Sequence, residues 1–149
     1  MENADTLVKL EMDTFYQIIN KHATDLSKNV KSADIYQEGT ADNKDFVIHS
    51  YHEKDSQKFL CFPLDNGSFA ITDKHSGKVA YPQYYKSGND VVVSQISWDG
   101  NTMEQWYVFQ ESSTGYYYIK NAQTGKVFDV YAQQTADDKN IVQHDWHSQ

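Results

Sequence analysis

The stretch from Asp34 to His52 reads DIYQEGTADNKDFVIHSYH, and it recurs 95 residues later, from Asp129 to His147, as DVYAQQTADDKNIVQHDWH. Nine of the 19 aligned positions are identical without a gap, and several others exchange similar residues, such as Ile35 for Val130. Agreement of this kind indicates an internal duplication, and a repeat has to be recognised before single elements are assigned.

A middle copy lies between these two stretches. Ser76 to Tyr81 matches Thr124 to Asp129 at a spacing of 48 residues, and Phe69 to Asp73 matches Tyr117 to Asn121 at the same spacing. The first copy offers Tyr16 to Asn20 at this place. We therefore expect a single domain over residues 1–149, divided into three repeats at about 5–56, 57–104 and 105–149.

Each repeat is predicted to form four short strands with turns between them. Residues Tyr117 to Asn121 alternate between two faces, as a half-buried strand requires, and glycine pairs such as Asn66-Gly67 and Thr124-Gly125 mark turns. Three repeats of four strands make twelve, the number in a β-trefoil, so we expect an all-β protein with that architecture.

The N-terminal segment also allows another interpretation. Five apolar residues could share one face of an amphipathic helix: Leu7, Leu10, Phe15, Ile18 and Ile19. The matching segments of the other two repeats resemble strands, and this register favours strands here as well.

Composition and charge exclude several classes of function. The net charge is −8 and the pI is near 5.0, which argues against nucleic acid and anionic membranes as partners, since both need clustered Lys and Arg. No apolar stretch is long enough to insert into a membrane. The polar start, Met1 to Asp5, is unlike a secretory signal and predicts a cytoplasmic location. The single cysteine, Cys61, lies between Leu60 and Phe62 and is expected to be a buried, unreactive thiol.

The repeat resembles the ricin B-chain-type lectin unit. That unit has a Tyr-x-Ile-x-Asn strand, a Gly-Lys-x-Leu-Asp-Val segment, a Val-Gln strand and a closing Gln-x-Trp. The third copy carries Tyr117 to Asn121, Gly125 to Val130 and Val142-Gln143. The closing motif departs from the pattern, because Gln57-Lys58-Phe59 follows the first copy and Glu104-Gln105-Trp106 follows the second.

The resemblance implies a non-catalytic, carbohydrate-binding lectin or hemagglutinin for galactose- or N-acetylgalactosamine-type glycans, with no cofactor. The aspartate of the Leu-Asp-Val position is Asp129 in the third copy and Asp34 in the first, whereas the second has Tyr81, which predicts an altered pocket there. Ile48 stands where Gln143 does, so we expect the first pocket to be the weaker. The carbohydrate-binding residues expected from this comparison are Asp129, Gln143, Asp145, Trp146, His147, Asp34, His52 and Gln57.

Other functions and partners stay open at this point. A β-trefoil can also be a protease inhibitor, with the connection 21–33 as the bait loop, or a protein-docking module of a toxin or adhesin complex. Glycans and glycoproteins are the expected partners, with a homodimer or a toxin partner left open. The spacing of His49 and His52 is repeated at His144 and His147. On a strand, residues three apart face opposite ways, so we expect no metal site.

Overall fold

The computed structural model describes residues 5–25 and 30–146 of the protein. In that part of the chain there are twelve strands and five single-turn 3-10 helices, and no α-helix. The all-β prediction is confirmed. The strands are β1 (Thr6–Leu7), β2 (Phe15–Tyr16), β3 (Lys31–Ile35), β4 (Phe46–Ser50), β5 (Phe59–Pro63), β6 (Phe69–Asp73), β7 (Val79–Pro82), β8 (Val91–Ile96), β9 (Trp106–Gln110), β10 (Tyr117–Asn121), β11 (Val127–Val130) and β12 (Lys139–His144). The 3-10 helices are η1 (Tyr36–Glu38), η2 (Asp55–Gln57), η3 (Gln83–Tyr85), η4 (Thr102–Glu104) and η5 (Tyr131–Gln133).

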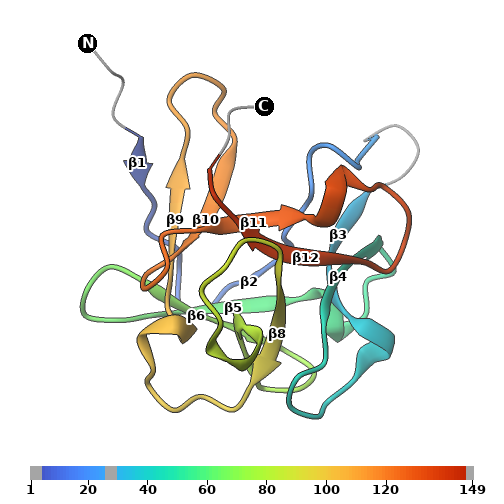
Figure 1. Ribbon diagram of the computed structural model, residues 1–149, viewed down its shortest axis with the longest axis horizontal. Helices are drawn as coiled ribbons and strands as arrows, with labels where there is room; N and C mark the ends of the chain where they lie inside the picture. The colour runs from blue at the N-terminus through green and yellow to red at the C-terminus, as the bar shows by residue number, and fades with distance from the viewer. Residues whose placement is uncertain (1–4, 26–29, 147–149) are drawn as a thin grey trace.

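Strand pairing follows the threefold repeat. The last two strands of each repeat form an antiparallel hairpin, β3 with β4, β7 with β8 and β11 with β12. Strand β12 also pairs with β8 and with β4, and so it connects all three repeats. Figure 1 shows β12, in deep red, beside β4, in cyan. The arrangement is the β-trefoil that the duplication predicts.

The first repeat is the least regular of the three. Strands β1 and β2 have two residues each, and they pair with β9 and β5 rather than with each other. A single bridge between Ile19 and Ser32 stands where β6 pairs with β7 in the second repeat. The segment described from residue 5 to 25 therefore contains strands and no α-helix, as the repeat register predicts.

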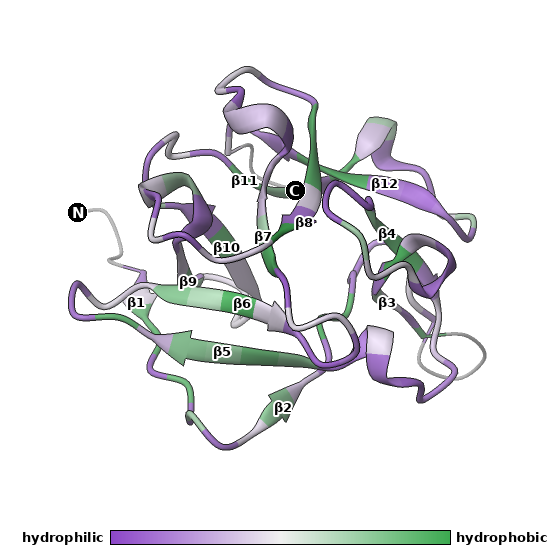
Figure 2. Ribbon diagram, turned by 90° about the horizontal axis from the view of Figure 1, so that it is seen from below, coloured by the Kyte–Doolittle hydropathy of each residue, from purple (hydrophilic) through white to green (hydrophobic). Residues whose placement is uncertain are grey.

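Apolar side chains from all three repeats meet in one core. Trp106 is fully buried, and its Nε1 donates a hydrogen bond to the carbonyl of Ala80 at 2.9 Å. Its ring packs edge-on against Phe128, while Phe46 stacks on Phe59 with 5.5 Å between ring centroids. Figure 2 shows the hydrophobic residues concentrated along the strands and the hydrophilic ones along the loops. Trp106, the aromatic residue of the closing motif after the second repeat, is therefore part of the core.

Three equivalent loops, each between the two strands of a hairpin, contact a neighbouring repeat. Asn43, Asp90 and Asp138 have φ values of 66°, 65° and 66°, a left-handed conformation that Asn and Asp tolerate better than most residues. The backbone N–H of each donates to a strand carbonyl of the neighbouring repeat, on Gln95, Gln143 and Ile48 respectively, at 2.7–2.8 Å. Every repeat therefore holds a loop residue of another repeat against the outer end of its own hairpin.

Three smaller expectations are also met or limited by the structure. Cys61 is buried, and burial raises the pKa of its thiol to about 12, as expected of an unreactive cysteine. Residues 26–29 of the connection proposed as a protease bait loop lie outside the described residues. Across the described ranges, no helix is long and apolar enough to cross a membrane.

Candidate functional site

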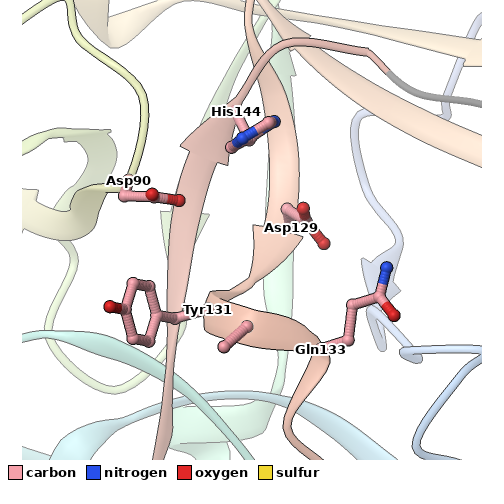
Figure 3. Close-up of a pocket in the computed structure, with 6 residues that line it drawn as sticks. Asp90, Asp129, Tyr131, Gln133 and His144 are labelled. Carbon is pink, nitrogen blue, oxygen red and sulfur yellow. The ribbon is translucent and has the colours of Figure 1, made fainter.

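An open pocket of about 410 Å³ lies at the outer end of the third repeat. Its walls come from β11, η5 and β12 of that repeat and from the loop of the second repeat that precedes β8 (Figure 3). We call it the third-repeat pocket, and its lining residues are Asp90, Asp129, Tyr131, Ala132, Gln133 and His144.

Asp129 is held in a fixed orientation by the backbone. Its Oδ1 accepts a hydrogen bond from the backbone N–H of the next residue, Val130, at 2.9 Å. Asp34 makes the same contact with the N–H of Ile35 at 2.8 Å. The two aspartates that the repeat predicts as binding residues thus share one local geometry at the ends of equivalent hairpins.

Tyr131 supplies an aromatic side chain that the sequence analysis did not assign to the site. The chain leaves β11 through η5, in which Ala132 and Gln133 have φ values of 52° and 55°. This turn keeps Tyr131 beside the pocket, and 49% of its surface is exposed. The signal was present in the duplication, because Asp34-Ile35-Tyr36 and Asp129-Val130-Tyr131 share the tyrosine two residues after the aspartate.

Gln143 does not face the pocket, and its assignment as a sugar contact was wrong. Its side chain is fully buried; Nε2 donates to the carbonyls of Lys86 and Gly88, both at 3.0 Å. Its Oε1 accepts a hydrogen bond from the hydroxyl of Thr124 at 3.0 Å. The loop of the second repeat packs over this amide, so Gln143 braces the segment that brings Asp90 to the pocket.

The residues that follow β12 lie beside the pocket but do not line it. Asp145 forms an ion pair with Lys126 at 3.2 Å and exchanges hydrogen bonds with Asn89. The bond from Asn89, followed by that from Lys126, lowers the pKa of the Asp145 carboxyl below its usual value. Trp146 packs against Tyr118, with 4.4 Å between ring centroids, and is 47% exposed, so it is not a core residue. His147 lies outside the described residues.

His144 occupies the place in the pocket that the sequence analysis gave to its neighbours. As neighbours on a strand, His144 and Gln143 face opposite sides. However, the face carrying His144 turns toward Asp129, and the face carrying Gln143 turns inward. The Nδ1 atom of His144 lies 2.9 Å from the carbonyl oxygen of Asp145, which fixes the ring plane.

A second pocket, of about 220 Å³, lies at the equivalent place in the first repeat. We call it the first-repeat pocket, and its lining residues are Asp34, Gln37, Glu38, His49, His52, Lys54 and Asp138. Two of its carboxylates already have imidazole partners, since His52 Nε2 lies 3.0 Å from Asp34 Oδ2 and His49 Nδ1 lies 3.0 Å from Asp138 Oδ1. Only 4% of Asp34 is exposed.

The two histidines of this pocket correct an expectation from strand periodicity. The rings of His49 and His52 lie 5.5 Å apart instead of on opposite faces, because β4 ends at Ser50 and the chain bends after it.

A nearby carboxylate, Asp137, bonds to Lys31 and Ser50. Burial acts to raise the pKa of Asp137, but these bonds outweigh it and the net pKa is lowered. In the described part of the chain, no group of three or more His, Cys, Asp or Glu side chains is arranged to hold a metal ion.

Gln57 is also a brace and not a pocket residue, which corrects its assignment. Its side chain is fully buried. Its Oε1 accepts a hydrogen bond from the backbone N–H of His52 at 2.8 Å, and its Nε2 donates to the carbonyl of Ser50 at 3.1 Å. The closing glutamine of the motif therefore shapes the bend that places His52 over Asp34.

The second repeat has a phenol where the other two have a carboxylate. Tyr81 is 1% exposed, and its hydroxyl bonds to Asn43, the loop residue contributed by the first repeat. Its ring packs edge-on against Tyr85 at 4.8 Å. Burial raises the pKa of the Tyr81 hydroxyl. At this position the side chain makes internal contacts, in keeping with the altered pocket expected from the sequence.

Comparison with known proteins places this geometry in a family. Residues 66–144 match the model of the ricin-type beta-trefoil lectin domain-like family, which is more than half of the chain. The protein belongs to this family, and membership supports carbohydrate binding. No curated protein sequence compared with the chain matches it.

Several solved structures share the fold. The designed threefold-symmetric protein ThreeFoil superposes with a TM-score of 0.82 at 24% identity, covering 91% of each chain. An exo-β-1,3-galactanase from Clostridium thermocellum gives 0.81 at 22% identity, over 90% of this chain and 28% of that one. The C-terminal half of the earthworm R-type lectin, solved in complex with GalNAc, gives 0.65 at 16% identity, over 91% and 90%.

Proposed function

We propose that the protein is a lectin whose principal site is the third-repeat pocket, and that it binds galactose- or N-acetylgalactosamine-type sugars without a catalytic step. The observation that carries the proposal is the placement of Asp129 and Tyr131 in one open pocket. A fixed carboxylate accepts hydrogen bonds from neighbouring sugar hydroxyls, and hydrogen bonds to a charged group contribute about 1.5–3 kcal/mol each. An exposed aromatic side chain beside it offers a surface to the apolar side of the sugar ring.

The choice of sugar rests on the comparisons. The earthworm lectin was solved with GalNAc, and the Clostridium enzyme is an exo-β-1,3-galactanase, so two proteins that share this fold are associated with galactose-type sugars. We extend that preference to this chain as a proposal. Because the pocket is open to solvent, we expect it to bind a monosaccharide in the millimolar range, which corresponds to about −4 kcal/mol.

The test is a titration of the intact chain with galactose, N-acetylgalactosamine and glucose, followed by calorimetry and by a glycan array. We expect weak saturable binding of the first two sugars and much weaker binding of glucose, whose C4 hydroxyl points to the other side of the ring. Absence of binding of every sugar up to high millimolar concentration would contradict the lectin proposal. Equal binding of all three would keep the lectin and reject the galactose preference.

A second candidate is an accessory role in a larger assembly. In the Clostridium galactanase, the matched part is 28% of the chain, so a domain of this fold is joined there to other parts. We propose as the alternative that this chain docks onto a protein partner, such as a toxin component. A docking module is indifferent to Asp129, so co-purification with a candidate partner that is unchanged by Asp129→Asn favours docking, and loss of glycan capture by the same variant favours the lectin.

A further inference from the structure

The charge around the third-repeat pocket suggests which sugars of the galactose class bind best. Two carboxylates line it from different repeats, Asp129 from β11 and Asp90 from the loop before β8. Among the described lining residues there is no Lys or Arg. The nearby cation Lys126 is ion-paired with Asp145.

Asp90 is held in place from several directions. Its backbone N–H donates to the carbonyl of Gln143 at 2.8 Å, and its φ of 65° fixes the direction in which the side chain leaves the loop. Two residues before it, the Gly88 carbonyl accepts a hydrogen bond from the buried Gln143 amide. Next to it, Asn89 exchanges hydrogen bonds with Asp145. The loop backbone that carries this carboxylate is therefore preorganised, and little backbone freedom is lost when a ligand meets it.

The first-repeat pocket has the same two acidic positions, and each of them has an imidazole partner. Asp138, the counterpart of Asp90, lies 3.0 Å from His49, and Asp34, the counterpart of Asp129, lies 3.0 Å from His52. That pocket also includes Lys54, which forms an ion pair with Glu38 at 3.3 Å. In the third repeat, the imidazole equivalent to His49 is His144, whose Nδ1 faces the carbonyl of Asp145.

We propose that the third-repeat pocket prefers an amino sugar with a free ammonium group, such as galactosamine, over the neutral sugar, and disfavours the acidic sugar of the same ring, with Asp90 as the residue that sets this order. The inference rests on the proposed lectin function and narrows its ligand class. A fixed carboxylate attracts a cation a few ångströms away and repels an anion at the same place. Because the pocket is open, added salt weakens both effects, with a Debye length of about 8 Å at physiological ionic strength.

The experiment compares galactosamine, galactose and galacturonic acid on the intact chain by calorimetry at about pH 7, where the uronic acid is ionised and much of the sugar amine is protonated. We expect galactosamine to bind about tenfold more tightly than galactose, and galacturonic acid about tenfold more weakly, a difference of about 1.4 kcal/mol at each step. Raising the salt concentration should reduce the differences in affinity among the three sugars, because salt screens the charges.

Asp90→Asn is the decisive variant, with Asp138→Asn as its matched control from the first repeat. Asp90→Asn should reduce the preference for galactosamine over galactose to about threefold or less, measured as the ratio of the two affinities in the variant itself. Asp138→Asn should leave the order unchanged. The inference is overturned if the three sugars bind equally, or if the order survives Asp90→Asn while galactose still binds. If none of the three sugars binds the wild-type chain, the lectin proposal and this inference both fail.

Discussion

The first and third repeats carry the same aspartate in the same backbone geometry, yet the two pockets around it differ. Asp34 is almost fully buried and shares its second oxygen with His52, whereas Asp129 lies in a larger pocket beside an exposed tyrosine. The difference between the two pockets arises from the residues around each aspartate. Ile48 in the first repeat stands where Gln143 braces an incoming loop in the third. A duplicated binding residue is therefore not a duplicated site, because other residues decide what reaches it.

The largest effect is expected from the core that both pockets share. Trp106→Ala removes a fully buried ring and its hydrogen bond to Ala80. Such a deletion costs roughly 3–5 kcal/mol, out of a typical domain stability of about 5–15 kcal/mol. We expect a large fall in the denaturant midpoint and loss of both pockets together. A stable, folded variant would show that this ring does not support the trefoil core.

A second prediction compares equivalent turns in the second and third repeats. Asn121 accepts two backbone N–H bonds through Oδ1 and donates through Nδ2 to the carbonyl of Met103 at 2.9 Å. Asp73 makes the same two acceptor bonds, but within the described part of the chain its Oδ2 has no hydrogen-bond partner. Burial raises the pKa of Asp73 to about 7, with the charges of Asp34 and Asp55 adding to it.

The raised pKa of Asp73 makes the stability of the protein depend on pH in a definite direction. Between the unfolded pKa of about 4 and the folded pKa of about 7, the native state holds a proton that the unfolded state has lost, so stability falls as pH rises through that window. Each pKa unit of this difference corresponds to about 1.4 kcal/mol, so the free energy of unfolding falls by a few kcal/mol across the window. Asp73→Asn should flatten this part of the profile and raise the melting temperature at pH 8 by several degrees. Urea melts from pH 4 to pH 8 measure it, and an unchanged slope in the variant contradicts the assignment.

A smaller effect is expected from the tyrosine that follows each aspartate. Tyr131→Ala should weaken sugar binding by about three- to tenfold, because an aromatic contact contributes about 0.5–1.5 kcal/mol beyond its buried area. Tyr36→Ala, the same change in the first repeat, is the matched control and should leave the affinity within about twofold, since Tyr36 does not line the first-repeat pocket. Calorimetry with galactose checks both. Equal losses from the two variants would remove the distinction between the pockets.

The fold was predictable from the sequence because duplication reports on the whole chain at once. Nine identities between residues 34–52 and 129–147 set the repeat, and the repeat settled the ambiguous N-terminal segment. The positions of Asp129, Asp34 and Trp106 followed from the same register. The burial of Gln143 and Gln57 could not be predicted from this register. The period of two separates the faces of a strand, but it does not show which face a loop from another repeat covers.

The place of Asp90 in the pocket could not be predicted from the sequence, for a related reason. Three strands, β8, β9 and β10, separate it from Asp129 along the chain, and only the trefoil brings its loop to the third repeat. The proximity of His49 and His52 depended on where β4 ends, which residue periodicity does not indicate. Sites assembled between repeats need the pairing of strands from different repeats, which the sequence of one repeat does not contain.

The most direct test of the central claim is the number of sugars bound per chain under saturating galactose, measured by calorimetry on the wild type and on two matched variants. The account predicts about one sugar per chain, loss of that binding in Asp129→Asn through removal of a charged acceptor, and an affinity within about twofold of wild type in Asp34→Asn. Thermal melts run in parallel establish that both variants are folded. One sugar per chain that survives Asp129→Asn, or two per chain with equal losses from both variants, would contradict the assignment of the site to the third repeat.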